Sequence, residues 1–97
     1  MPEPPARRDD LYRRAETAWG ADAQMNKAAE EFAEAAAALN RALNDQGSRE
    51  DVLEELADVR LVLEQMERSF FEADEVDAAI ARAVDDLEDR LEEHGDG

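Results

Sequence analysis

Apolar residues recur at the spacing of an α-helix along most of this chain, and this periodicity limits what it can fold into. One stripe is centred on Phe32 and another on Leu56 at 100° per residue. The stripes contain Met25, Ala28, Ala36, Leu39 and Leu43 on the first segment, and Val52, Val59, Leu63, Met66 and Phe70 on the second. No segment alternates apolar and polar residues as a strand does. The pattern predicts an all-α chain.

Punctuating residues divide this pattern into four expected helices. Asp22, Ser48 and Asp74 stand where N-caps are expected, with Asp51 at the capping-box position after Ser48. "NDQG" has the composition of a turn. We expect helices over about residues 9–19, 22–43, 49–71 and 75–94, with the turn at 44–47. Together they predict a four-helix bundle-like subunit.

The proline-rich residues 1–8 are expected to form a flexible tail, and residues 9–97 a single domain. The chain carries 27 acidic and 11 basic residues, for a net charge of −16. Such a charge repels nucleic acid polymers and anionic membranes, and it suits a halophilic source, where salt screens self-repulsion. Without cysteines, a membrane-length apolar run or a signal segment, a cytoplasmic protein is expected.

Two pairs of acids occupy matching places on the second and third expected helices. Glu31 and Glu34 lie about 100° and 160° to one side of their apolar stripe. Glu55 and Asp58 have the same offsets on the next helix. A short turn makes the helices antiparallel neighbours, and both pairs lie about 18 Å from that turn. We therefore expect the four carboxylates to converge at one edge of the helix pair.

Converging carboxylates repel one another unless they are protonated or neutralised by a cation. Oxygen ligands suit hard divalent ions, Mg²⁺ or Mn²⁺ above all, and Mg²⁺ commonly bridges to substrate phosphates. The alternative is a solvated acidic flank in which Lys27 and Glu31 form an i,i+4 ion pair. The spacing alone decides little, because "DDLED" at 85–89 repeats it by chance. From geometry alone, both interpretations stay open.

The segments "WGADAQMNKAAEEFAEAAAALNRAL" and "REDVLEELADVRLVLEQMERSF" resemble the MazG-like all-α nucleotide pyrophosphohydrolases over about residues 19–71. The signature of that family is E-E-x-x-E, a spacer, and E-x-x-D. Here it is read as Glu30, Glu31 and Glu34, then a spacer over 35–54, then Glu55 and Asp58. The flanking patterns Q-x-x-K-x-x-E-E and E-E-L-A-D-V are also typical of the family.

The resemblance implies that Glu31, Glu34, Glu55 and Asp58 bind Mg²⁺, with Mn²⁺ as the other metal considered. It implies hydrolysis of a nucleoside triphosphate to a monophosphate and pyrophosphate, in nucleotide-pool clean-up. A bound metal would neutralise phosphate charge and lower the pKa of a water. One glutamate of the pair Glu31 and Glu34 would take that water's proton, so both are candidate catalytic residues. A homodimer or homotetramer is expected.

Three residues before the acids are candidate substrate ligands: Trp19, Gln24 and Lys27. Gln24 and Lys27 share the flank of Glu31 and Glu34. Lys27 either pairs with the polyphosphate or forms the ion pair with Glu31. Trp19 either stacks on a nucleobase or plugs a core or an interface.

The last expected helix departs from the family pattern. Relatives often carry basic residues there, whereas "RAVDDLEDRLEEH" is mostly acidic and keeps only Arg82 and Arg90. The sister phosphoribosyl-ATP pyrophosphohydrolases carry a tyrosine-histidine pair where "VRLVLEQ" stands here. The competing hypothesis is a non-catalytic acidic helical interaction or oligomerisation module. A second apolar strip on the third helix, formed by Leu53, Ala57, Leu61 and Phe71, predicts self-association.

Overall fold

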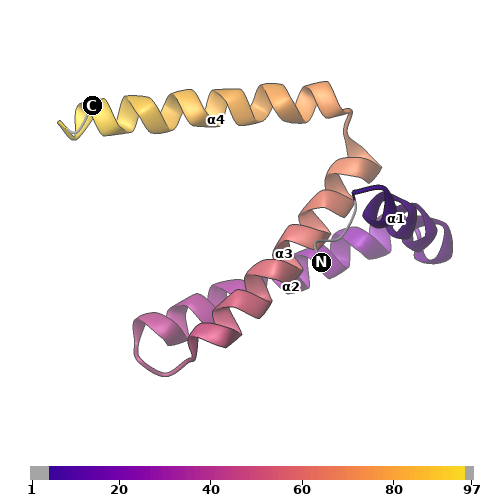
Figure 1. Ribbon diagram of the computed structural model, residues 1–97, viewed down its shortest axis with the longest axis horizontal. Helices are drawn as coiled ribbons and strands as arrows, with labels where there is room; N and C mark the ends of the chain where they lie inside the picture. The colour runs from indigo at the N-terminus through magenta and orange to yellow at the C-terminus, as the bar shows by residue number, and fades with distance from the viewer. Residues whose placement is uncertain (1–4, 96–97) are drawn as a thin grey trace.

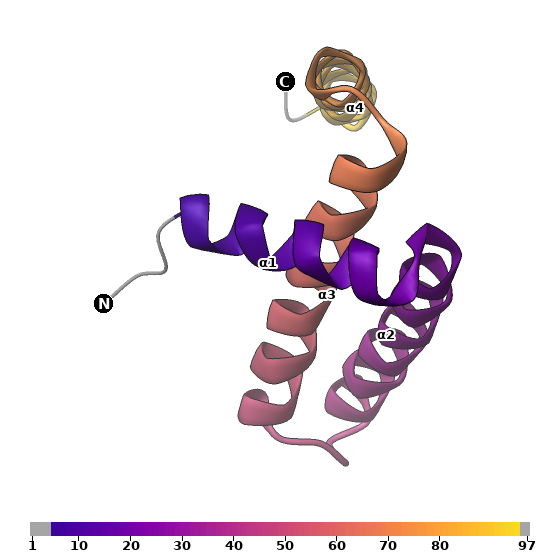
Figure 2. The ribbon, with the colours of Figure 1, turned by 90° about the vertical axis from the view of Figure 1, so that its right-hand side faces the viewer.

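The computed structural model describes residues 5–95, which form four helices joined by short connections and contain no strand. The helices are α1 (Pro5–Trp19), α2 (Ala21–Leu43), α3 (Arg49–Phe70) and α4 (Ala73–Glu93). Helices α2 and α3 form an antiparallel hairpin, α1 crosses its open end, and α4 extends away (Figures 1 and 2). The all-α prediction is confirmed. Within one chain, however, the helices do not close into a four-helix bundle. None of the described helices is long and apolar enough to cross a bilayer.

The start of α1 differs from the expectation. The helix begins at Pro5, so residues 5–8 are helical although the sequence placed them in the tail; residues 1–4 of that tail lie outside the described residues. Proline is compatible with the first helical turn because its missing N–H has no intrahelical partner there. A proline-rich stretch therefore marks a helix start here rather than continued tail.

Two predicted N-caps are wrong, and one is confirmed. Gly20, not Asp22, caps α2, because it leaves α1 with φ 87°, a conformation that favours glycine, and α2 starts at the next residue. Glu72, not Asp74, precedes α4, because the connection from α3 is so short that Asp74 already lies in the first turn. Ser48 caps α3 as predicted, and its Oγ accepts a hydrogen bond from the Asp51 N–H at 3.1 Å.

The surface through which α2 packs on α3 overlaps the predicted stripe of α2 only at Ala28. The buried residues of α2 are Gln24, Ala28, Glu31, Ala35 and Ala38, and Val62 is buried on α3. Phe32 and Leu56, the centres of the predicted stripes, remain 39% and 44% exposed. Small alanine side chains let the helix axes approach closely. The seam is therefore turned toward Glu31, and the large apolar residues face outward from the single chain.

Helix α1 is tied to α3 by polar contacts around Glu64. The Tyr12 hydroxyl donates to Glu64 Oε1 at 2.7 Å, and Arg8 Nε donates to the same oxygen at 3.1 Å. Burial raises the pKa of Tyr12 to about 12, and the Glu64 carboxylate acts in the same direction. Farther along, Arg68 Nε donates to Asp9 Oδ1 at 2.6 Å. These bonds hold α1, and with it Trp19 at its end, against the hairpin.

Candidate metal centre

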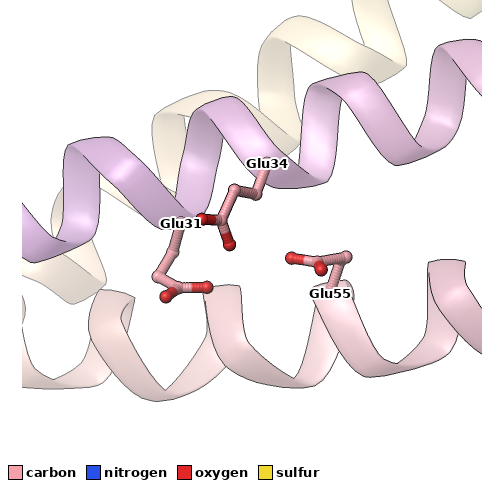
Figure 3. A group of neighbouring side chains, drawn as sticks. All are labelled: Glu31, Glu34 and Glu55. Atoms are coloured by element: carbon pink, nitrogen blue, oxygen red, sulfur yellow. The ribbon is translucent and has the colours of Figure 1, made fainter.

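Three carboxylates from two helices converge in the space between α2 and α3. Glu31 and Glu34 come from adjacent turns of α2, and Glu55 reaches across from α3 (Figure 3). One oxygen from each residue lies within 4.8 Å of the other two. The structure thus brings together three of the four predicted metal ligands. Asp58 contributes no oxygen to this group, although its charge acts on Glu55.

Burial differs among these acids. Glu31 is 6% exposed, Glu55 is half-buried and Glu34 is exposed. Oε2 of Glu31 and Oε2 of Glu55 are both buried and have no hydrogen-bond partner among the described residues. A buried charged oxygen without a partner is costly, since it has lost its water and gained nothing in exchange. These two oxygens are therefore in the state that a bound cation would relieve.

The electrostatics of the cluster follow from this crowding. Burial raises the pKa of the Glu55 carboxyl, and the charges of Glu34, Asp58 and Glu31 raise it further, while Arg41 lowers it. The folded chain thus holds the Glu55 proton more tightly than a free carboxyl does. This is the physical sign of a site with more negative charge than its surroundings balance.

Lys27 supplies the nearest positive charge. Its Nζ lies 3.1 Å from Glu31 Oε1 and 3.9 Å from Glu30 Oε2. The hydrogen bond to Glu31 and the charge of that carboxylate raise the pKa of Lys27. The predicted i,i+4 pair is thus formed, and it engages Oε1 of Glu31 while leaving Oε2 unpaired. Lys27 itself is exposed, so it has room to meet another anion.

A pocket of about 510 Å³ adjoins the acids. All three predicted substrate ligands, Trp19, Gln24 and Lys27, line it. The remaining lining residues are Ala23, Glu31, Asp58, Leu61, Val62 and Gln65. Apolar and amide side chains thus line the pocket at the α1 end, and charged side chains line it next to the carboxylates. Such a pocket suits a ligand with a flat apolar part and an anionic part.

The structure narrows the alternatives for Trp19 to nucleobase stacking or an interface, and it adds a residue. Trp19 is 72% exposed, so it does not plug the core of this chain. Gln65 lines the pocket but was not among the predicted ligands. It lies seven residues after Asp58 and hence on the same face of α3, at a spacing that puts it about two turns farther along. That spacing is the signal by which sequence reasoning would have found it.

No family model, curated protein or solved structure matches this chain. The geometry of the acids and the pocket, together with the signature spacing in the sequence, is what points to a function.

Proposed function

We propose that this protein is a Mg²⁺-dependent nucleoside triphosphate pyrophosphohydrolase that releases pyrophosphate and a nucleoside monophosphate. The observation that carries the proposal is the convergence of Glu31, Glu34 and Glu55, with two buried oxygens that lack partners in the described part of the chain. The adjoining pocket and the resemblance to the MazG-like family support it. A solvated acidic flank would leave these oxygens in water, whereas Glu31 is 6% exposed.

The residues fit a hard divalent cation. Mg²⁺ binds oxygen at about 2.0–2.1 Å, so two of its ligands lie up to about 4.2 Å apart, and larger divalent ions allow somewhat more. The oxygen separations within the cluster do not exceed 4.8 Å, which is close to that range. Carboxylates alone, with no histidine or cysteine, favour Mg²⁺ or Mn²⁺ over softer metals. Glu31, Glu34 and Glu55 would hold the ion, and Asp58 would add charge nearby.

In the proposed reaction a water oxygen adds to phosphorus and the anhydride bond between the α and β phosphates breaks, so that pyrophosphate leaves. When bound, the cation supplies charge neutralisation and makes the water more acidic. Glu34 is the better placed of the two candidate bases, because it is exposed and Oε1 of Glu31 is already paired with Lys27. Lys27 would turn its ammonium toward the phosphate chain.

Helix α4 offers little to such a substrate. Arg82 lines a different pocket, formed between the end of α3 and the start of α4. The acids Asp85, Asp86 and Asp89 make no three-residue cluster with any other described residue. In the proposed enzyme, phosphate binding within one chain thus falls to Lys27 and the cation.

We also propose that the protein works as a homo-oligomer. The chain exposes 7626 Å², whereas a compact monomer of this mass exposes about 5,500 Å². The difference, about 2,100 Å², lies within the 1,000–2,500 Å² or so that each partner of an obligate homodimer buries. Phe32, Leu63 and Leu87 are among the large apolar residues that remain exposed. The same surface is what favours the competing hypothesis, an interaction module without catalysis.

One assay separates the two hypotheses. The full chain is incubated at high salt with each NTP and dNTP, with and without Mg²⁺, and pyrophosphate is measured. The enzyme hypothesis requires Mg²⁺-dependent release that falls at least about 100-fold in Glu34→Gln. Glu50→Gln is the control, because Glu50 is exposed and outside the cluster. No release from any nucleotide, together with no Mg²⁺ binding by calorimetry, would leave the interaction module.

A further inference from the structure

Gln24 is the most buried polar residue of the pocket outside the acid cluster. It lies in the first turns of α2 and is 6% exposed. Ser69 Oγ, on α3, donates to its Oε1 at 3.2 Å. Its Nε2 is buried and has no hydrogen-bond partner among the described residues. One half of this amide is thus satisfied and the other half is left as an unused donor.

The contact with Ser69 fixes which way the amide points. With Oε1 engaged by the serine hydroxyl, the NH₂ group is what Gln24 has left to offer the pocket. A buried unpaired donor is unfavourable by an amount that a ligand acceptor would recover. A ligand that presents another donor at this point would leave both groups unpaired. The site therefore discriminates between ligands by the hydrogen-bonding character of one atom.

We propose, on the basis of the function proposed above, that Gln24 reads the nucleobase and selects bases that carry an exocyclic carbonyl. Uracil, thymine and guanine present a carbonyl oxygen where cytosine and adenine present an amino group. Gln24 Nε2 donates to that oxygen, and the exposed ring of Trp19, at the same α1 end of the pocket, stacks against the base.

The layout of α2 agrees with a nucleotide in this orientation. Gln24, Lys27 and Glu31 follow one another on successive turns of one helix face and all line the pocket. Gln24 and Glu31 are about 10 Å apart along the helix axis. The base thus lies at the α1 end, and the phosphates reach Lys27 and the carboxylates. Ser69 is a positioning residue, since it acts only through the orientation of Gln24.

The test uses the full chain at high salt and the fluorescence of Trp19, the single tryptophan of the sequence. UMP, GMP, CMP and AMP are titrated with and without Mg²⁺, so that binding is measured apart from hydrolysis. We expect UMP and GMP to bind about tenfold or more tightly than CMP and AMP, respectively, as one unpaired buried donor implies. Equal affinities within each pair, or no binding of any nucleotide, would overturn the proposal.

Variants of the amide sharpen the test. Gln24→Glu keeps the shape but replaces the donor by an acceptor, so the preference should reverse toward CMP and AMP. Gln24→Leu should abolish the preference. Ser69→Ala frees the amide to rotate, so the preference should shrink while UMP affinity changes little. Gln46→Leu, in the exposed α2–α3 turn, is the control. Circular dichroism is used to check that each variant folds. An unchanged preference in the folded Gln24→Glu variant would contradict the proposed role of Gln24.

The two proposals fail separately. Selective binding without pyrophosphate release would remove the enzymatic function and leave the base-reading role of Gln24. Pyrophosphate release with the same base preference in wild type and in Gln24→Glu would do the reverse.

Discussion

The same spacing of acids occurs on α2 and on α4, but of these two helices only α2 contributes acids to a carboxylate cluster among the described residues. Glu30, Glu31 and Glu34 on α2 repeat the pattern of 85, 86 and 89 on α4. On α2, Glu31 and Glu34 face Glu55 across the hairpin and form a cluster, whereas on α4 nothing described stands opposite the acids. No residue of α4 is buried. A motif on one helix thus becomes a site only when a second element supplies the facing ligands.

Removing the facing acid on α3 tests this difference between α2 and α4 most directly. Glu55→Gln takes one carboxylate from the α3 side and should lower Mg²⁺-dependent pyrophosphate release at least about 100-fold. Replacing Asp85, Asp86 and Asp89 together by Asn should leave the rate unchanged within about twofold, because these acids belong to no cluster. Comparable losses in both variants would mean that the charge of the chain, and not the cluster, supports the reaction.

Association should respond almost as strongly to changes on the exposed apolar surface. Leu63→Asp places a charge among the outward-facing residues of α3, and we expect it to convert the oligomer to monomers in analytical ultracentrifugation at high salt. Leu87→Asp tests the exposed apolar surface of α4 in the same way. Asn26→Asp adds the same charge to α2 at an exposed position about 120° from the Phe32 stripe, and it should leave the oligomer intact. A monomeric wild-type chain at high salt would contradict the oligomer proposal itself.

The stability of the metal-free protein should depend on pH through Glu55. Its pKa is raised on folding, so the folded chain holds this proton more tightly than the unfolded chain does. The contribution to stability is present below the unfolded pKa and is lost as pH rises through the folded one. We expect Mg²⁺ to raise the melting temperature by several degrees at pH 7.5 and by less as Glu55 becomes protonated.

The variant Glu55→Gln isolates this effect. It should raise the metal-free melting temperature at pH 7.5 and remove the response to Mg²⁺. Glu54→Gln, an exposed neighbour on α3, should do neither. Differential scanning fluorimetry over a pH series measures both. A melting temperature that responds equally to Mg²⁺ in both variants would place the ion elsewhere.

The smallest expected effect is that of helix capping on stability, at the starts of α3 and α4. Ser48 makes a side-chain capping bond and Glu72 makes none. Ser48→Ala should lower the free energy of unfolding by about 1 kcal/mol, as measured by urea denaturation. Glu72→Ala should change it by no more than a few tenths of a kcal/mol. An equal loss at both positions would show that the α3 cap contributes nothing specific.

Much of the local structure follows from the residues alone. Helical periodicity indicated the all-α class, and residue types indicated the turn at 44–47 and the cap at Ser48, because these depend on neighbours within about one turn. Matching offsets and equal distance from the turn predict that Glu31, Glu34 and Glu55 converge, and the structure brings these three together. The boundaries at Pro5 and Gly20 were missed, since backbone conformation at a junction depends on both flanking helices.

Which face of each helix is buried was decided only by the tertiary structure. The sequence indicates the most apolar stripe, around Phe32, but the hairpin packs through small residues that allow a closer approach of the helix axes. The helices are therefore rotated so that Glu31 lies inside the seam, and its Oε2 has no partner among the described residues. It also places Asp58 outside the three-residue cluster. Periodicity determines the angles between side chains on one helix, whereas the rotation of two helices against each other depends on the shapes that meet.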